Sequence, residues 1–238
     1  MPLTLYWGCT INARFPQIKN ALRKILNKSG IDFIEFSEDL CCGLPLVLSG
    51  DPGEASTLAG RLIRKLEGSE TVLTPCAGCY ATFTKRYQKI LGCKVPFVVL
   101  HSTQLIDQLI TCGQLKLTGK GETSVVFHDP CELGRKCGVY EEPRRILRSI
   151  PNVKLVEATF AGERSNCCGG GGLLPSSFPE LAIEIASKRI SRDILPLKPE
   201  SLVTSCPSCY LNFSRSMERG DYGIRLLDIV EIVEEHIR

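Results

Sequence analysis

Several signatures that would assign a function quickly are missing from this 238-residue chain. No apolar run approaches the roughly 20 residues needed to span a bilayer. The start, Met1-Pro2-Leu3-Thr4, lacks the basic and apolar regions of a secretory signal. The formal net charge is only +3, with basic residues spread along the chain, so nucleic acid is not expected as a partner. We therefore expect a cytoplasmic protein without direct membrane insertion.

Motifs for common redox cofactors and nucleotides are missing too. The sequence contains no C-x2-C-x2-C-x3-C-P run of bacterial ferredoxins, no dinucleotide fingerprint and no recognisable flavin motif. The glycine run 169–172 is not followed by the Gly-Lys-Ser/Thr of a phosphate loop. If the protein handles electrons, it must therefore exchange them with another protein.

Cysteine, in contrast, is abundant, and ten of the thirteen cysteines form two copies of one pattern. The spacings are C-x31-CC-x33-C-x2-C and C-x35-CC-x37-C-x2-C. The first set is Cys9, Cys41, Cys42, Cys76 and Cys79, and the second set is Cys131, Cys167, Cys168, Cys206 and Cys209. An odd total and the lack of an export signal argue against a disulfide framework, so we predict metal ligands. The remaining Cys93, Cys112 and Cys137 are expected to be small buried hydrophobic residues.

The number of thiols in each set favours iron–sulfur sites over two simpler alternatives. A four-thiolate zinc site built from Cys76, Cys79, Cys206 and Cys209 would leave six patterned cysteines unused. A thioredoxin-type redox motif also explains only one C-x-x-C. Five thiols per set is one more than a tetrahedral zinc or an ordinary four-cysteine cluster uses. Thiolate is also the soft ligand that iron–sulfur clusters select.

The hydrophobic pattern predicts an α/β fold made of two pseudo-symmetric repeats, each a small mostly parallel sheet flanked by helices. The repeats are expected at 1–115 and 122–238. Strands are predicted at 3–7, 31–36, 72–74, 125–127, 153–156 and 202–204, and helices at 15–28, 54–66, 81–91, 143–149 and 179–194. Leu226 and Leu227 are assigned to an apolar terminal helix. Because the cysteines follow strands, they should converge at the carboxyl ends of each sheet, with Gly43 and Gly169 permitting the bend after each Cys-Cys pair.

The two cysteine sets resemble the cysteine-rich CCG domain, and their tandem arrangement is similar to the B-type component of heterodisulfide reductase. The resemblance implies one noncubane 4Fe–4S cluster on each five-cysteine set. It also implies a disulfide oxidoreductase subunit in which the ten cysteines act, through the clusters, on a small thiol or disulfide. Its partners would be a C-like iron–sulfur subunit and an A-like flavoprotein subunit. Two alternatives stay open: an electron-relay subunit, as in lactate- or glycolate-oxidising and sulfur-oxidising relatives, and a zinc-stabilised assembly protein.

The histidines add one further candidate. His128 opens the run His128-Asp129-Pro130-Cys131-Glu132, in which Glu132 replaces a histidine often seen in the family. His128 is a candidate donor of a proton or hydrogen bond to cluster or substrate, and a hydrogen-bonded strand-end histidine is the alternative. We expect a structural role for His101 and a surface position for His236.

Overall fold

The computed structural model describes residues 3–92 and 94–238, and each half of the chain forms one sheet of four parallel strands. The strand orders are β2-β1-β3-β4 and β6-β5-β7-β8. The strands are β1 (Leu3–Leu5), β2 (Phe33–Glu35), β3 (Thr71–Thr74), β4 (Val98–His101), β5 (Thr123–Phe127), β6 (Val153–Val156), β7 (Ser201–Thr204) and β8 (Arg225–Asp228). The predicted fold of two pseudo-symmetric α/β repeats is confirmed.

Helices connect the strands in the same order in both halves. The first half contains α1 (Cys9–Arg14), α2 (Pro16–Lys28), α3 (Leu44–Ser49), α4 (Pro52–Lys65), α5 (Ala77–Ala81), a π-helical turn η1 (Thr82–Arg86), α6 (Tyr87–Leu91) and α7 (Ser102–Thr111). The second contains α8 (Gly134–Cys137), α9 (Glu141–Ser149), the 3-10 turn η2 (Gly162–Arg164), α10 (Leu174–Ser177), α11 (Pro179–Arg189), the π-helical turn η3 (Ile190–Ile194), the 3-10 turn η4 (Leu195–Leu197), α12 (Pro207–Arg219) and α13 (Ile229–Glu235). Within the described residues, no helix is both long enough and apolar enough to cross a bilayer.

Local sequence explains where the main helices begin and which face they bury. The Asp51 side chain accepts a hydrogen bond from the Glu54 backbone N–H at 3.0 Å and caps α4, with a proline at the first helical position. On α2, the buried residues Ile18, Leu22 and Ile25 recur at helical spacing and form its apolar face. Burial of that face, more than helix propensity, stabilises a helix of this length.

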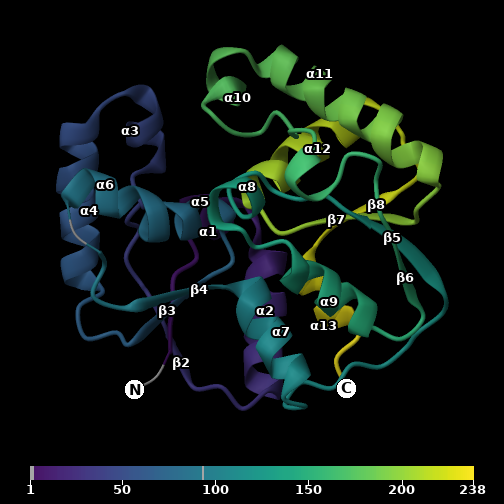
Figure 1. The fold of residues 1–238 in the computed structure, drawn as a ribbon, viewed down its shortest axis with the longest axis horizontal. Coiled ribbons are helices and arrows are strands. Elements are labelled where there is room, and N and C mark those ends of the chain that lie inside the picture. Colours follow the sequence, from purple (N-terminus) through teal and green to yellow (C-terminus); the bar gives the residue numbers. More distant parts are fainter. Residues whose placement is uncertain (1–2, 93) are drawn as a thin grey trace.

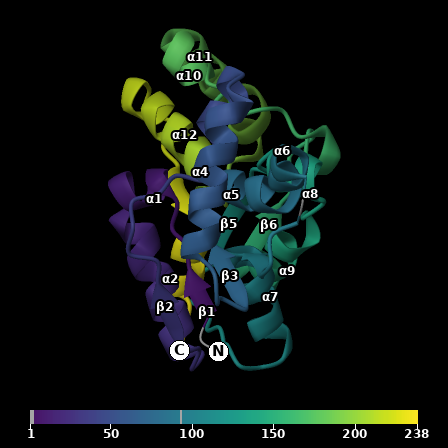
Figure 2. The ribbon, with the colours of Figure 1, turned by 90° about the vertical axis from the view of Figure 1, so that its left-hand side faces the viewer.

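Four helices lie between the two sheets and join the halves. Figure 1 shows α2, α7, α9 and α13 in the middle of the molecule, with α2 packed on α13 and α7 packed on α9. The buried core in this layer combines residues of both halves, including Leu22 and Phe127. The outer face of the first sheet is covered by α4, which crosses in front of it in Figure 2. In the second half, α11 and α12 pack on each other on the outer side.

The strand order determines where a ligand can bind. In each sheet the chain moves from the first strand to one neighbour and then crosses to the other side, so the order reverses between β1 and β3 and between β5 and β7. Open parallel sheets bind ligands outside the carboxyl ends of their strands at such a switch point. In both halves the chain leaves these two strands just before a patterned cysteine.

Two predictions about the carboxyl-terminal region are wrong. Leu226 and Leu227 belong to β8, which pairs in parallel with β7, and the terminal helix begins only at Ile229. His236 is not at the surface: it is 4% exposed and its Nδ1 lies 2.8 Å from the Ile232 carbonyl oxygen. The backbone N–H of Thr118 donates to the His236 carbonyl at 2.8 Å, so the segment between the repeats covers the end of α13.

The three cysteines outside the pattern have different surroundings. Cys112 is exposed at the end of α7, so the prediction that it is buried is wrong. Cys137 is partly buried and packs against the outer core of the second half. Cys93, for which burial was also predicted, lies outside the described residues.

Candidate metal centres

The first cysteine set is brought together by three loops at the carboxyl ends of the first sheet. Cys9 begins α1 after β1, Cys76 caps α5 after β3, and the Cys-Cys pair lies in the loop that follows β2. The Sγ atoms of Cys9 and Cys41 are 3.7 Å apart. Cys41 and Cys42, Cys42 and Cys79, and Cys79 and Cys76 are also close enough for their thiols to interact and shift each other's pKa. All five thiols of this set therefore form one connected group.

The second set repeats this arrangement on the second sheet. The Sγ atoms of Cys168 and Cys209 are 3.0 Å apart. Cys131 and Cys167, Cys167 and Cys168, and Cys206 and Cys209 are also close enough for their thiols to interact and shift each other's pKa. All twelve described cysteines are free thiols. The structure thus gathers the predicted quintets, and the assignment of each thiol as a ligand stays a prediction.

Backbone groups around the thiols favour the thiolate form. Gly43 and Gly169, at φ of 80° and 77°, adopt the left-handed conformation that glycine tolerates best. Their N–H groups donate to the sulfurs of Cys41 and Cys167, each at 3.4 Å. The Cys79 N–H likewise donates to the Cys76 sulfur at 3.4 Å, in the first turn of α5. The hydrogen bond with Cys42 raises the pKa of Cys41, and the Gly43 N–H opposes that shift by stabilising the thiolate. The Gly169 N–H acts in the same direction as the thiol hydrogen bonds that lower the pKa of Cys167.

Within each set, interacting thiols shift each other's pKa in opposite directions, so that one thiol of a pair ionises more readily than the other. The hydrogen bond with Cys41 lowers the pKa of Cys42, whereas the hydrogen bond with Cys42 raises the pKa of Cys79. In the second set, the hydrogen bond between Cys131 and Cys167 raises the pKa of the former and lowers that of the latter. A bound cation would displace the shared protons and favour ionisation of all the thiols. Closely packed soft donors of this kind fit an iron–sulfur cluster.

The contacts also bear on the four-thiolate zinc alternative. That site requires the C-x-x-C cysteines of both halves to meet. Among the described cysteines, the thiol contacts above join members of the same half: Cys79 contacts Cys42, and Cys209 contacts Cys168. Two separate groups of thiols are therefore favoured over one site shared between the halves.

His128 lies beside the second set. One nitrogen of its ring and the sulfurs of Cys168 and Cys209 all lie within 4.8 Å of one another. The ring packs edge-on against Phe213 with a centroid distance of 4.9 Å, and the buried Nδ1 has no partner among the described residues. Burial, followed by the nearby positive charge of Arg189, lowers the pKa of His128 to about 3. The imidazole is therefore neutral near pH 7.

The first set has a different neighbour at the equivalent position. The Tyr6 N–H donates to the Leu73 carbonyl and the His128 N–H to the Val203 carbonyl, both at 2.8 Å, so Tyr6 and His128 occupy matching places. The Tyr6 hydroxyl donates to the Leu40 carbonyl at 2.7 Å. An imidazole next to the thiols is thus a feature of the second half.

An arginine anchors the loop that carries Cys131, and the sequence pattern did not reveal it. Arg144 on α9 donates to both carboxylate oxygens of Asp129, at 2.7 and 2.9 Å, and to Glu157 at 2.8 Å. Asp129 also accepts the Gly162 N–H at 2.8 Å. Asp129 lies two residues before Cys131, so this network positions the first ligand candidate of the second set.

In the first half, an arginine also holds the loop before the first cysteine, but it acts through a tryptophan ring. Arg23 on α2 donates to Glu35 at 2.6 and 2.8 Å and lies over the Trp7 ring, 5.4 Å from its centroid. The Trp7 Nε1–H donates to the same carboxylate at 3.0 Å. Trp7 lies two residues before Cys9, as Asp129 lies before Cys131. One arginine per repeat therefore fixes this loop, through an aromatic ring in one half and an ion pair in the other.

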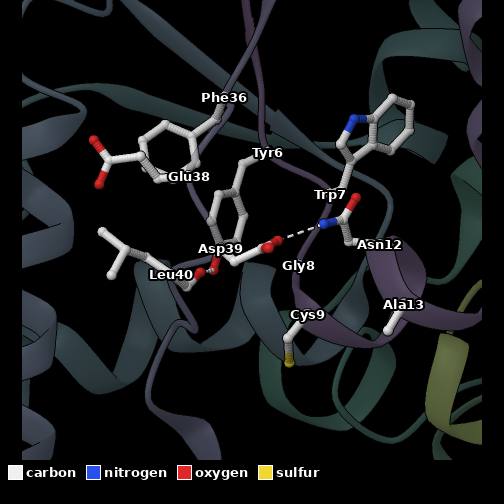
Figure 3. A pocket seen from close by; sticks show the side chains of 10 residues that line it. All are labelled: Tyr6, Trp7, Gly8, Cys9, Asn12, Ala13, Phe36, Glu38, Asp39 and Leu40. Atoms are coloured by element: carbon white, nitrogen blue, oxygen red, sulfur yellow. Dashed lines mark hydrogen bonds between the residues drawn. The ribbon is translucent and has the colours of Figure 1, made fainter.

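Each cysteine set has a cavity beside it. One, of about 430 Å³, lies beside Cys9. Figure 3 shows the Tyr6 and Phe36 rings on one side, Trp7 on the other, and the hydrogen bond between Asn12 and Asp39 across it. The other, of about 500 Å³, is lined by all five cysteines of the second set, by Leu44 and Leu48 of α3, and by Arg215 of α12. This second cavity lies between the halves.

Fold and site together define a tandem α/β protein with a cluster of five thiols at the switch point of each sheet. A family model described as "Cysteine-rich domain" (CCG) matches residues 3–84 and 125–214. The chain belongs to this cysteine-rich domain family and carries two copies of the domain, one in each half. The family match confirms the resemblance inferred from cysteine spacing.

Named relatives cover nearly all of this chain. It is 33% identical to the D component of dihydromethanophenazine:CoB–CoM heterodisulfide reductase of Methanosarcina acetivorans, over 98% of this chain and 58% of that protein. It is 33% identical to the B component of fumarate reductase (CoM/CoB) of Methanothermobacter marburgensis, over 96% of this chain and 45% of that protein. Lactate utilization protein A 2 of Bacillus cereus is 24% identical, over 98% of both chains. The chain thus spans about half the length of the first two relatives.

Proposed function

We propose that this chain is an iron–sulfur subunit of a heterodisulfide-reductase-like complex and that it interconverts a disulfide and two thiols. Each five-cysteine set would hold one 4Fe–4S cluster, of the noncubane type by family resemblance. Bound clusters of this kind accept and pass on single electrons. The observation that carries the proposal is the cavity of about 500 Å³ lined by every cysteine of the second set, because it gives a small molecule access to that site.

The proposed reaction balances with two electrons and two protons. The sulfur–sulfur bond of the disulfide breaks, and each sulfur leaves as a thiol carrying one proton. The electrons come from a protein partner whose own reduced cofactor is oxidised, which by resemblance is a C-like iron–sulfur subunit supplied by an A-like flavoprotein. In the opposite direction two thiols are oxidised and the partner is reduced.

His128 would take part as a neutral group. Its ring lies beside Cys168 and Cys209, and its pKa of about 3 leaves it uncharged at neutral pH. A neutral imidazole carries one N–H, so hydrogen bonding to a sulfur is favoured over delivery of a proton from the charged form. The proposed role is therefore positioning of the second site.

An electron-relay subunit that binds no substrate is the second candidate. The similarity to the lactate utilization protein, which extends over 98% of this chain, favours it. The two candidates differ in substrate access. Addition of a thiol or a disulfide to the purified holoprotein should change the cluster EPR signal if the site is catalytic, and should leave it unchanged if the clusters only pass electrons.

Iron analysis of single cysteine variants tests the ligand assignment. The wild-type protein, purified without oxygen, should contain about eight irons and little zinc, by analogy with two 4Fe sites. Cys42→Ser and Cys168→Ser should each lose about half of the iron because each removes a ligand from one site only. Cys112→Ser is the matched control, since this exposed thiol lies outside both sets. A variant of either set with full iron content would refute the five-ligand assignment, and a zinc-only protein would refute the function.

A further inference from the structure

The cavity on the second cysteine set is lined by one paired and one unpaired charged side chain. Two charged residues line it within the described part of the chain, Glu132 and Arg215. Glu132 is neutralised by Arg86, which donates to both of its carboxylate oxygens at 2.7 and 2.9 Å. Arg215 is partly buried and has no hydrogen bond or ion pair with any described residue. Arg215 thus brings an unpaired positive charge to the lining of a cavity whose other residues are mainly thiols, glycines, uncharged polar residues and apolar side chains.

Arg215 lies on the face of α12 that lines the cavity. Ser208, Leu211, Asn212 and Arg215 all line the cavity and follow one another at the spacing of a single helical face. Cys209 lies six residues before Arg215, which corresponds to about 9 Å along the helix axis. Side chains on a helix tilt towards its amino end, which is the end that carries the thiols. The guanidinium is therefore within reach of a group attached by a short linker to a sulfur at the second site.

Apolar residues from both halves form the rest of the wall. Leu44 and Leu48 come from α3 of the first half, and Leu173 and Leu211 come from the second half. Such walls suit a short hydrocarbon linker. In this partly desolvated setting an unpaired arginine binds an oxyanion more strongly than it would in water, with two parallel N–H donors for carboxylate, sulfonate or phosphate.

We propose that Arg215 selects sulfur substrates by binding an anionic substituent joined to the reacting sulfur through a short apolar chain. The proposal rests on the proposed function, since it requires the sulfur to reach the second cysteine set. Arg215 is a specificity-determining residue, and the substrate class is a small anionic thiol or its disulfide.

Thiols of matched length test this assignment on the holoprotein. The probes are 3-mercaptopropionate, 3-mercapto-1-propanesulfonate, neutral 3-mercapto-1-propanol and cationic cysteamine, each titrated while the cluster absorption and EPR spectra are followed. Wild type should bind the anionic probes about tenfold to a hundredfold more tightly than the neutral one. Arg215→Gln should abolish that preference, and Arg215→Lys should retain part of it because the charge remains without the planar fork. Comparison of the carboxylate and sulfonate arms shows which oxyanion is preferred.

A control on the same helix and a second readout separate this role from others. Arg219→Gln removes the same charge one turn later, where the arginine pairs with Glu180 outside the cavity lining, and should leave the preference intact. If Arg215→Gln shifts the cluster midpoint potential but keeps the wild-type preference, Arg215 acts on the cluster and the inference is overturned. Equal binding of anionic and neutral probes by wild type overturns it as well, while the proposed function stands. If no probe changes the spectra of wild type, the proposed function fails and this inference fails with it.

Discussion

At the scale of single residues, buried charge is the feature on which the second site depends most. The side chains of Arg144 and Asp129 are 6% and 3% exposed, so neither charge is solvated by water. Removal of either side chain would leave the other as an isolated buried ion, which strongly destabilises the folded protein. The Cys131 loop is thus fixed by an interaction that is expensive to break, whatever its net contribution to folding.

Arg144→Met should therefore destabilise the protein by about 3 to 5 kcal/mol, since it leaves Asp129 buried without its counter-ion. Urea unfolding of the variant and wild type would measure the difference. Arg148→Met on the same helix is the control: this arginine is 55% exposed and its nearest carboxylate oxygens are at 3.6 and 4.0 Å. Its loss should change stability by about 0.5 kcal/mol or less. Equal effects of the two substitutions would show that the buried network does not anchor the loop.

The sequence predicted the residues that share a type and a spacing, and missed those that act through distant contacts. The cysteine sets were found because ten thiols recur in one order, and the structure places each set together. Arg144 and Arg215 carried no such signal, because arginine is common on helix surfaces and its partner is set by the fold. Comparison of the two repeats provides a sequence signal for Arg144. Arg23 and Arg144 lie on equivalent helices, each between the first cysteine and the Cys-Cys pair of its repeat.

At the scale of elements, the residue after each Cys-Cys-Gly turn packs closely against the helix of the C-x-x-C motif. The two repeats place the larger residue on opposite sides of this contact. The residue after Cys42-Gly43 is Leu44, and the residue after Cys168-Gly169 is Gly170. In the first half Leu44 packs against Gly78, where an added Cβ would lie 3.0 Å from the leucine side chain. In the second half Gly170 faces Ser208, whose carbonyl oxygen would lie only 2.3 Å from an added Cβ. The larger residue follows the Cys-Cys-Gly turn in one repeat (Leu44, at the start of α3) and lies on the helix of the C-x-x-C motif in the other (Ser208, on α12).

Gly170→Ala should consequently disrupt the second site. The clash is with backbone atoms of the first turn of α12, which cannot rotate away, so we expect a loss of about 1 to 3 kcal/mol together with loss of iron from that site. Gly171→Ala is the neighbouring control, since nothing lies within 4 Å of a Cβ at that position. Unfolding midpoints and iron contents of both variants would be compared. If Gly170→Ala retains wild-type iron and stability, close packing of the loop on α12 is not required.

Element prediction succeeded where hydrophobic patterns were long and failed where they were short. Helix α2 and strand β6 follow the predicted ranges closely, because each has a clear period. The short helices α1 and α3 and the strand β8 were not predicted. The Leu226-Leu227 run is compatible with either a helix or an edge strand, and only pairing with β7 decides between them.

At the scale of the whole molecule, the two repeats share their inner core. The α2 and α13 helices come from opposite halves and bury apolar residues against each other, and α7 and α9 do the same. The division at 1–115 and 122–238 stays a prediction about the repeats of the sequence. Independent folding does not follow from it, because each half alone would expose the apolar faces that the other covers.

The intact protein should therefore unfold in one cooperative transition. A fragment of residues 1–115 should be insoluble or lack fixed tertiary structure, because Ile18, Leu22 and Ile25 would face water. Denaturant unfolding followed by both circular dichroism and Trp7 fluorescence would test this, since the tryptophan reports on the first half. Two separated transitions, or a stable soluble fragment, would show that the repeats are autonomous domains.

Parallel strands also set the polarity of the molecule. The chain enters the first sheet at the amino end of β1 and finishes after α13, which runs back from the carboxyl end of β8. Figure 2 shows the start of β1 and the end of the chain after α13 close together at the lower end of the molecule, whereas α1, α5 and α12, at whose starts patterned cysteines lie, are further up. A fused protein attached after α13 would therefore extend away from the cavity on the second cysteine set and leave that cavity accessible to small molecules.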